Sequence, residues 1–257
     1  MRLALVVEYD GADFHGSQLQ EGVRTVQGEL EGALSRIYGR HLRVAFASRT
    51  DAGVHAVGQV AALDVEDELD PCTLQRALNF HTPVDIAIRK LQVAREGFDP
   101  RRDALNREYV YRLRDGEAPH PLYRSMEFYV RGPLDEGLMD ETARQFVGSH
   151  DFASFAGPAT PKDAATSRDV FDARVTRESD RLEIRIVANA FLHQQIRRMA
   201  AVLVEVGRGR MDRDEVAEMV GNPTKGTASK LLEPRGLCLM SIEYGPEGPF
   251  AGQPAYN

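Results

Sequence analysis

Residues 48–56 read SRTDAGVHA, a polar stretch that interrupts two apolar segments of the chain. The preceding residues 44–47 and the following residues 59–65 are rich in β-branched and apolar side chains, a pattern typical of buried strands. The polar stretch is therefore predicted to be a loop held between two strands. Asp51 is its single carboxylate, and Arg49 lies two residues before it.

Two interpretations of Asp51 follow from these neighbours. A nearby guanidinium favours the charged form of a carboxylate and can lower its pKa by roughly 1–3 pH units, which suits an ionised nucleophile or base. An aspartate that follows threonine and precedes Ala-Gly also suits an ordinary turn, in which its side chain accepts a backbone N–H. The residue pattern alone leaves both interpretations open.

The segment RTDAGVHA at 49–56 resembles the signature of the tRNA pseudouridine synthases that modify the anticodon arm, the TruA family. The resemblance implies that Asp51 is the catalytic nucleophile. It also implies that Arg49 helps to displace the target base and that His55 supports the same substrate-binding loop. Ser48 stands where the family usually has glycine.

Length and composition predict an ordinary globular protein. The chain has 257 residues, of which 42% are hydrophobic and 28% charged, enough for one large domain or two smaller ones. Its apolar start is soon interrupted by Glu8 and Asp10, so it predicts neither a signal peptide nor a membrane span. The two cysteines, Cys72 and Cys238, belong to no metal-ligand pattern. We expect a cytoplasmic protein that needs no metal or other cofactor.

The net charge of −7 argues against a uniformly basic surface that coats nucleic acid. Arginine is nevertheless concentrated in a few segments, which could form a basic face that binds phosphates. Solvated faces of helices and strands would explain any one of these clusters equally well. The clusters are Arg36, Arg40 and Arg43; Arg101, Arg102, Arg107, Arg112 and Arg114; and Arg197, Arg198, Arg208 and Arg210.

Strands and helices alternate in the first hundred residues. Residues 3–8 predict a strand, and Thr25 is a suitable N-cap for an amphipathic helix that ends near residue 38. Residues 71–79 predict a second helix and 86–93 a further strand. Together with the strands around the polar loop, this order is βαββαβ-like and predicts a mixed sheet covered by helices.

The resemblance to the TruA family extends across this half of the chain. The segments YDG at 9–11 and TVQ at 25–27, with the spaced residues Gly16, Gln18 and Gln20, are similar to the family's first motif. Ser17 occupies the position where the family commonly has tryptophan. A ring that would pack or contact RNA is therefore missing at this position.

The segment FDPRRDA at 98–104 has the composition of a linker, and a domain boundary is expected near Leu105. The strand predicted over 107–113 places Tyr109 and Tyr111 on one face, where Tyr111 suits the core with its hydroxyl at the edge. The rest of the chain predicts helices over 134–147, from 191 onward with Ile196, Met199, Leu203 and Val206 on the apolar face, and over 212–220. It also predicts strands over 170–177 and 182–187 and a last strand that ends near Tyr244.

The resemblance assigns three further residues in this region. Tyr109 matches the family's active-site tyrosine, which would stack on the flipped uracil. Arg101 lies in a matching Phe-x-x-Arg segment and is a candidate phosphate contact. FLHQQIR at 191–197 is similar to the third motif, in which the arginine, here Arg197, pairs with the catalytic aspartate. The residue pattern alone equally allows Arg197 to be a half-buried arginine with its charged end at the surface. Ala201 and Glu233 depart from the family's usual glycine and proline.

The expected fold class is α+β, with two ferredoxin-like (RRM-like) α/β halves whose mixed or antiparallel sheets are flanked by helices, and a cleft between the halves. The N-terminal half (1–105) would carry the catalytic Asp loop, the C-terminal half would span 106–245, and 246–257 would be a flexible tail. The resemblance further implies a homodimer that binds tRNA and isomerises uridine to pseudouridine at positions 38, 39 and 40 of the anticodon stem-loop.

Two other functions fit parts of the sequence. A metal-dependent hydrolase could use Asp51 and His55, but no further ligands follow at suitable spacing. A non-catalytic RNA-binding module built from ferredoxin-like halves could use Tyr109 and Tyr111 as stacking aromatics. RNA turnover in the presence of a chelator, with and without Asp51, separates the three functions.

Overall fold

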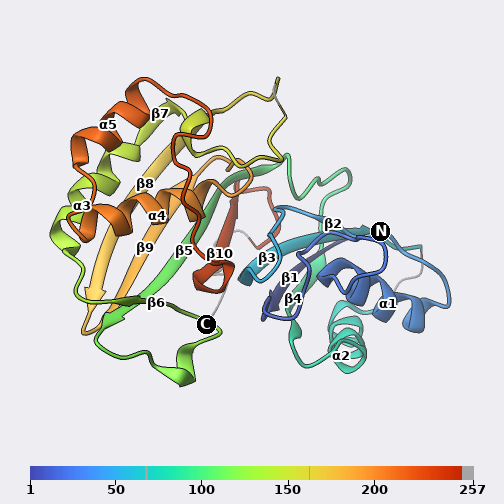
Figure 1. Cartoon of the computed structure of the whole chain (residues 1–257). Coiled ribbons are helices and arrows are strands. Elements are labelled where there is room, and N and C mark those ends of the chain that lie inside the picture. Colours follow the sequence, from blue (N-terminus) through green and yellow to red (C-terminus); the bar gives the residue numbers. More distant parts are fainter. Residues whose placement is uncertain (67–68, 162, 251–257) are drawn as a thin grey trace. The chain divides into compact units, whose positions relative to one another are not determined.

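The computed structural model of the chain describes residues 1–66, 69–161 and 163–250 (Figure 1). The chain divides into two compact units. The first unit comprises Met1–Arg107 and Cys238–Asn257, and the second comprises Glu108–Leu237. The division falls close to the boundary expected near Leu105. In sequence, the second unit is thus inserted before the last strand of the first. Of the expected tail, residues 251–257 lie outside the described residues.

The first unit has the predicted alternation of strands and helices. β1 is antiparallel to both β3 and β4, and β2 is antiparallel to β3, which gives the βαββαβ arrangement of a ferredoxin-like fold. The elements are β1 (Arg2–Tyr9), α1 (Val26–Tyr38), β2 (Ala45–Phe46), β3 (His55–Asp64), α2 (Pro71–His81), β4 (Ile86–Val93) and β10 (Leu237–Tyr244). The strand β5 (Ala104–Gly116) starts in this unit and continues into the second.

Local capping explains where the two helices of this unit begin and end. The Thr25 side chain accepts the Gly28 N–H at 3.2 Å, as predicted for an N-cap, and Gly39 ends α1 at a φ of 67° that favours glycine. Asp70 caps α2 in the same way by accepting the Thr73 N–H at 2.9 Å. The two helices lie side by side against the sheet (Figure 1).

The last strand, β10, completes the sheet of the first unit. It runs parallel to β3, with Cys238 opposite His55 and Leu239 opposite Ala56. The two strands approach so closely at Gly58 that a Cβ atom there would lie 2.3 Å from the Met240 carbonyl oxygen. The sequence analysis placed this strand with the second half of the chain because it follows that half in sequence. Contacts in space instead group it with the first unit.

In the second unit the sheet strands follow the order β5-β9-β8-β7, with β6 parallel to β5. Helices flank this sheet as well (Figure 1), so the predicted α+β class with mixed sheets and flanking helices is confirmed. The elements are β6 (Phe128–Arg131), α3 (Glu136–Ala143), β7 (Gly148–Asp151), β8 (Ser167–Glu178), β9 (Arg181–Ala188), α4 (Gln195–Gly207) and α5 (Arg213–Gly221). Short 3-10 helices lie at η1 (Pro121–Tyr123), η2 (Arg144–Phe146), η3 (Ala153–Phe155) and η4 (Pro234–Gly236).

The helix α4 differs in two respects from the prediction. It begins at Gln195 rather than near residue 191, because Gln194 has a φ of 60° and the Gln195 side chain accepts the Leu192 N–H at 2.8 Å. All of its residues are buried, so the expected one-sided apolar face is wrong. The helix ends at Gly207, and Gly209 follows it with a φ of 66°.

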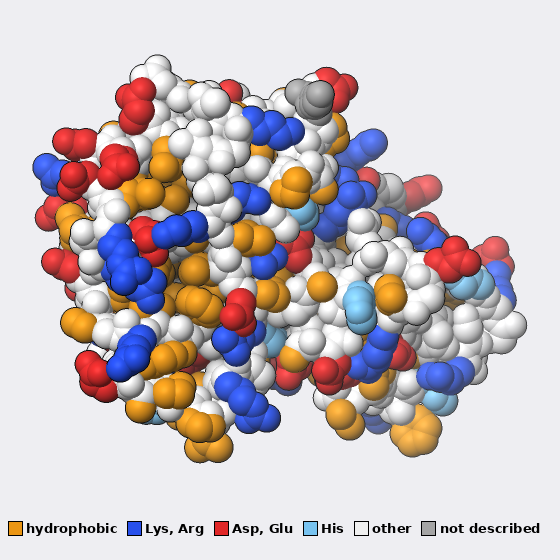
Figure 2. Space-filling view, viewed as in Figure 1, with side chains coloured by type: hydrophobic (Ala, Val, Ile, Leu, Met, Phe, Trp, Pro, Cys, Tyr) orange, Lys and Arg blue, Asp and Glu red, His pale blue; other side chains and the backbone are white. Residues whose placement is uncertain are grey.

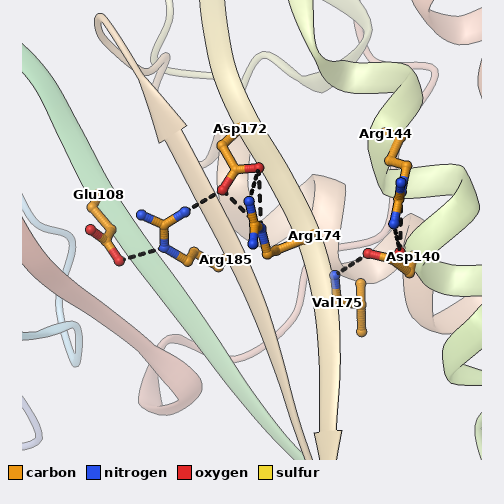
Figure 3. A network of polar contacts seen from close by, with 7 residues as sticks. All are labelled: Glu108, Asp140, Arg144, Asp172, Arg174, Val175 and Arg185. Atoms are coloured by element: carbon orange, nitrogen blue, oxygen red, sulfur yellow. Dashed lines mark hydrogen bonds and ion pairs between the residues drawn. The ribbon is translucent and has the colours of Figure 1, made fainter.

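A ladder of ion pairs crosses the sheet of the second unit (Figure 3). Glu108 on β5 pairs with Arg185 on β9 at 2.7 Å, and Arg185 pairs in turn with Asp172 on β8. Arg174 contacts the same Asp172 carboxylate at 3.0 Å. These alternating charges link three neighbouring strands, a form of cross-strand stabilisation that does not need apolar cover.

The helix α3 is tied to the same sheet through Asp140 (Figure 3). The Val175 N–H on β8 donates to the Asp140 carboxylate at 2.9 Å, and Arg144 contacts it at 2.6 Å. Burial alone would raise the pKa of Asp140, but these two contacts outweigh it and hold the pKa below its usual range. The carboxylate is therefore ionised wherever the unit is folded near neutral pH.

Candidate functional site

The Asp51 loop (residues 48–54) connects β2 to β3, as the sequence predicted. It is two residues shorter than expected because β3 already begins at His55. Asp51 is half-buried, whereas Arg49 is exposed. The backbone turns at this point, since the Val54 N–H donates to the Asp51 carbonyl at 3.2 Å and Gly53 has a φ of 77°.

A buried glutamine on β3 holds the first residue of the loop. The Gln59 side chain is fully buried and bonds both backbone groups of Ser48, accepting its N–H at 3.2 Å and donating to its carbonyl at 2.8 Å. The amide thereby replaces a strand partner for Ser48. Gln59 also donates to the Tyr9 hydroxyl at 3.4 Å, which extends the contact to β1.

The residue before Asp51 is fixed by a second set of buried contacts. The Tyr9 hydroxyl lies 2.8 Å from the Thr50 hydroxyl. Ser17 bonds the backbone of Thr50 in both directions, at 3.1 Å through its N–H and at 2.9 Å through its hydroxyl. Gly16 permits this approach, because a Cβ atom there would lie 2.8 Å from the Thr50 carbonyl oxygen.

The residues after Asp51 are held by the segment that follows β1. The Gly53 N–H donates to the Phe14 carbonyl at 3.2 Å. Gly11 packs so tightly against the loop that a Cβ atom there would lie 2.0 Å from the Val54 carbonyl oxygen. Arg24 keeps this segment in place, since its guanidinium lies 4.2 Å from the centre of the Phe14 ring and pairs with Asp85 at 2.7 Å.

His55 anchors the end of the loop rather than projecting into solvent. Its side chain is only 2% exposed, and its Nδ1 atom lies 3.0 Å from both the Gly11 N–H and the Asp10 carboxylate. One nitrogen cannot accept the first and donate to the second at the same time, so the tautomer decides which contact forms. Either contact ties the start of β3 to residues 10 and 11.

Arg101 is exposed, so its side chain is accessible to an anionic ligand. Its backbone is fixed by Asp99, whose carboxylate accepts the N–H groups of Arg102 and Arg101, each at 2.9 Å. These N–H groups, that of Arg102 most strongly, lower the pKa of Asp99. The Arg101 carbonyl accepts a bond at 2.6 Å from Arg107, a buried arginine that the sequence analysis counted only as part of a charged cluster.

Two predicted site residues belong to the second unit. Tyr109 on β5 is 4% exposed and meets Phe191 edge to face, with ring centres 5.3 Å apart. Arg197 on α4 is 9% exposed and donates through Nε to the Leu232 carbonyl at 2.8 Å. Arg197 is thus a buried, backbone-bonded arginine, not one that is half-exposed.

The surroundings of Arg197 are also buried. The Tyr111 hydroxyl donates to the Glu233 carbonyl at 2.6 Å, which confirms its predicted place in the core. Burial raises the pKa of Tyr111, although the nearby charge of Arg197 acts in the opposite direction. The next residue, Arg198, donates to the Ala228 carbonyl at 2.6 Å, and burial lowers its pKa. The two arginines together hold the segment from Ala228 to Leu232.

Sequence reasoning missed several residues that shape the site. The sequence analysis treated Ser17 as a departure from the family pattern and Arg107 as a member of a charged cluster. It treated Tyr9 only as part of a motif and Gln59 only as a strand residue. Tyr9 and Ser17 contact Thr50 across 41 and 33 positions of the chain, so no local pattern signals these contacts. Among the described residues no group of three or more His, Cys, Asp or Glu side chains could hold a metal ion. No helix in the described part is long and apolar enough to cross a membrane.

Comparison with known proteins gives a consistent result. A family model described as tRNA pseudouridine synthase matches residues 5–99 and 142–245. The chain is 39% identical over 250 residues to a tRNA pseudouridine synthase A of a Roseiflexus species, covering 96% of this chain and 92% of that protein. It is 38% identical over 244 residues to the Geobacter sulfurreducens protein of the same name, covering 94% and 99%. A solved chain of a Cbf5-Nop10-Gar1 complex aligns with 97% of this chain and 60% of its own at 10% identity, with a TM-score of 0.32, too low to support any inference.

Proposed function

The chain belongs to the tRNA pseudouridine synthase family, and from this premise we propose that it converts uridine to pseudouridine at positions 38, 39 and 40 of the anticodon stem-loop, with Asp51 as nucleophile. The broader activity follows from the family, which consists of isomerases that make pseudouridine in tRNA. The position in tRNA and the role of Asp51 are the parts that require testing.

The observation that supports Asp51 most directly is the rigidity of its loop. Backbone groups of Ser48, Thr50 and Gly53 are each bonded to residues outside the loop. A side chain in the middle of such a loop is held in place by its fixed backbone. Asp51 is half-buried. This suits a reacting carboxylate, which must contact the substrate and yet be shielded from bulk water.

The reaction requires the N1–C1′ bond of uridine to break, the detached uracil to rotate, and its C5 to bond to C1′. No atoms are gained or lost, so no co-reactant is needed. The Asp51 carboxylate could attack C1′ or C6 as a nucleophile, or remove a proton from the 2′ carbon as a base. The target base must first leave its stack, at a cost of a few kcal/mol.

The other site residues have supporting roles in this proposal. Arg49, exposed beside Asp51, replaces the extruded base, and Tyr109 stacks on the uracil. Arg197 serves the Asp51 carboxylate as its cation, and the exposed Arg101 contacts a phosphate. His55 is buried and orients the loop without touching substrate. We further propose that the protein acts in the cytoplasm as a homodimer, which sedimentation at several concentrations would test.

The deciding experiment compares Asp51→Asn with the native chain on an unmodified tRNA, mapping pseudouridine at each position. The asparagine is isosteric but neutral and cannot act as nucleophile or base, so we expect activity to fall by more than about 10³-fold. Binding of the tRNA should stay within about threefold. Asp64→Asn, at an exposed position on β3, is the matched control and should keep full activity.

Three results would contradict the proposal. Unchanged turnover in Asp51→Asn would remove this residue from the chemistry. Modification by the native chain at positions other than 38–40 would refute the proposed specificity while leaving the family activity intact. tRNA binding without any pseudouridine formation by the native chain would favour a non-catalytic RNA-binding module.

A further inference from the structure

The second unit contains a pocket that none of the proposed site residues lines. It has a volume of about 310 Å³ and lies at η1 and the start of β6. In Figure 2, hydrophobic side chains and arginine or lysine side chains adjoin on the surface over β6 and the preceding loop. The lining residues are Arg114, Pro119, His120, Pro121, Tyr123, Arg124, Glu127, Tyr129 and Arg235.

The three arginines of the pocket differ in what already neutralises them. Arg114 pairs with Glu127 at 2.6 Å and also with Asp180, so its charge is satisfied inside the fold. Arg235 pairs with the exposed Glu233 at 2.9 Å. Arg124 donates to the Pro121 carbonyl at 3.1 Å and pairs with no carboxylate among the described residues. The exposed Arg124 is therefore the cation that an anionic ligand meets first.

The aromatic ring of Tyr123, the residue before Arg124 in the chain, also lines the pocket. The Arg114 guanidinium lies 4.5 Å from the ring centre, so one face of the ring is already covered. The residue is nevertheless 47% exposed, so part of the ring is accessible, with the His120 ring centre 6.4 Å away. Tyr129 is fixed, because its hydroxyl donates to the Gly116 carbonyl at 2.8 Å. The pocket thus offers preorganised rings next to an available positive charge.

We propose that this pocket binds one unpaired nucleotide of the RNA substrate, other than the uridine that reacts. The base stacks on the exposed part of the Tyr123 ring, and the adjoining phosphate binds Arg124, with Arg235 nearby. An aromatic platform beside cations is the combination by which proteins hold single-stranded RNA without reading its sequence. The inference rests on the proposed function, because it takes tRNA as the ligand. It adds a second site at which the protein contacts that tRNA.

The aromatic ring beside Arg124 favours RNA over an anion without a base, because only RNA can both stack on the ring and bind the arginine. A proline-rich peptide would also find rings here, but it supplies no anion for Arg124. A second copy of the chain could instead cover the pocket through Leu122, whose side chain is 89% exposed. The experiment therefore measures both RNA affinity and oligomeric state.

The test uses the full chain and one unmodified tRNA, with affinity measured by filter binding at several salt concentrations and turnover by pseudouridine formation. For Tyr123→Leu we expect Kd and KM to rise about tenfold with kcat unchanged, whereas Tyr123→Phe retains the ring and the affinity. For Arg124→Gln we expect a severalfold weaker Kd and a salt slope reduced by about one. Arg213→Gln, an exposed arginine on α5, is the matched control and should bind as the native chain does. Circular dichroism establishes that each variant is folded.

Failure of the nucleotide pocket and failure of the proposed function give different results. Native Kd, KM and salt slope in folded Tyr123→Leu and Arg124→Gln overturn the inference, whether or not the native chain makes pseudouridine. A change in oligomeric state with unchanged RNA affinity overturns it as well, in favour of a second copy. A native chain that forms no pseudouridine refutes the proposed function, yet weaker tRNA binding by these two variants and not by Arg213→Gln would still establish the nucleotide pocket.

Discussion

Ser17 and Thr50 exchange two hydrogen bonds: the Ser17 N–H donates to the Thr50 carbonyl at 3.1 Å, and the Thr50 N–H donates to the Ser17 hydroxyl at 2.9 Å. Ser17 is fully buried, so the hydroxyl fills a specific place next to Asp51. Ser17, which stands where the family commonly has tryptophan, thus helps to hold the Asp51 loop in place.

Ser17→Ala should destabilise the fold and lower turnover together. The variant leaves the buried Thr50 N–H without its acceptor, which costs about 1–3 kcal/mol in the free energy of unfolding. We expect kcat to fall severalfold because the backbone next to Asp51 loosens. Urea unfolding and pseudouridine assays measure the two effects. Ser35→Ala, which removes a bond within α1, should leave kcat unchanged; equal losses in both variants would contradict a specific role for Ser17.

Gly11→Ala should be among the most damaging single substitutions in the first unit. The new Cβ would lie 2.0 Å from the Val54 carbonyl oxygen, a backbone atom that cannot rotate away. We expect a loss of at least about 2 kcal/mol in the free energy of unfolding, together with lower activity. Gly32→Ala is the matched control, since it lies inside α1 with no atom within 4 Å of its new Cβ, and it should stabilise the protein by up to about 1 kcal/mol. An active, stable Gly11→Ala would show that the loop can shift freely.

Arg197→Lys and Arg198→Lys should separate function from stability. Each variant loses a guanidinium bond to a carbonyl of the same segment, that of Leu232 or of Ala228, so both should lower the free energy of unfolding by about 1–3 kcal/mol. Only Arg197→Lys should also lower kcat by at least tenfold, because only Arg197 is proposed to serve Asp51. Similar kcat values in the two variants would reduce Arg197 to a structural role.

The Asp115–Arg177 pair predicts how stability depends on pH. Burial alone would raise the pKa of Asp115, but the bonds from Arg177, at 2.8 Å, and from the Leu134 N–H outweigh it and lower the pKa below 3.8. The contribution of this pair is therefore complete above pH 3.8 and is lost as the pH falls through the lower pKa of the folded state. At neutral pH, Asp115→Asn should cost about 3 kcal/mol in the free energy of unfolding. Urea titrations should show this difference shrinking toward about pH 2; a constant difference would contradict the assignment.

Local sequence patterns predicted most elements because their causes are local. The helix α1 begins and ends where Thr25 and Gly39 allow, and the Asp51 loop lies where the apolar alternation breaks. The start of α4 was wrong by four residues because the positive φ of Gln194 leaves no clear mark in the sequence. The same helix is buried on every side, because its charged side chains have partners outside the helix. Arg197 and Arg198 bond carbonyls of the 228–232 segment, and Glu205 pairs with Lys230 and with Arg208 just after the helix.

In the candidate site, too, some features follow from local sequence and others from the tertiary fold. The Asp51 loop could be proposed as part of the site because its residues are contiguous. Tyr109 and Arg197 could be proposed because each lies in a short motif. The contacts of Tyr9, Gln59 and Ser17 with the loop join residues up to 41 positions apart, as Tyr9 and Thr50 are. Such contacts depend on the tertiary fold, and no periodicity or spacing in a single sequence predicts them.

The parallel pairing of β10 with β3 determines when the protein can first become active during its synthesis. The start of β3 at His55 and Ala56, next to the Asp51 loop, gains its parallel partners from Cys238 and Leu239 on β10. A ribosome must therefore translate the entire second unit before the neighbourhood of Asp51 can be completed. A nascent chain that stalls before residue 238 would expose an unpaired strand edge beside the Asp51 loop, where another chain could pair with it.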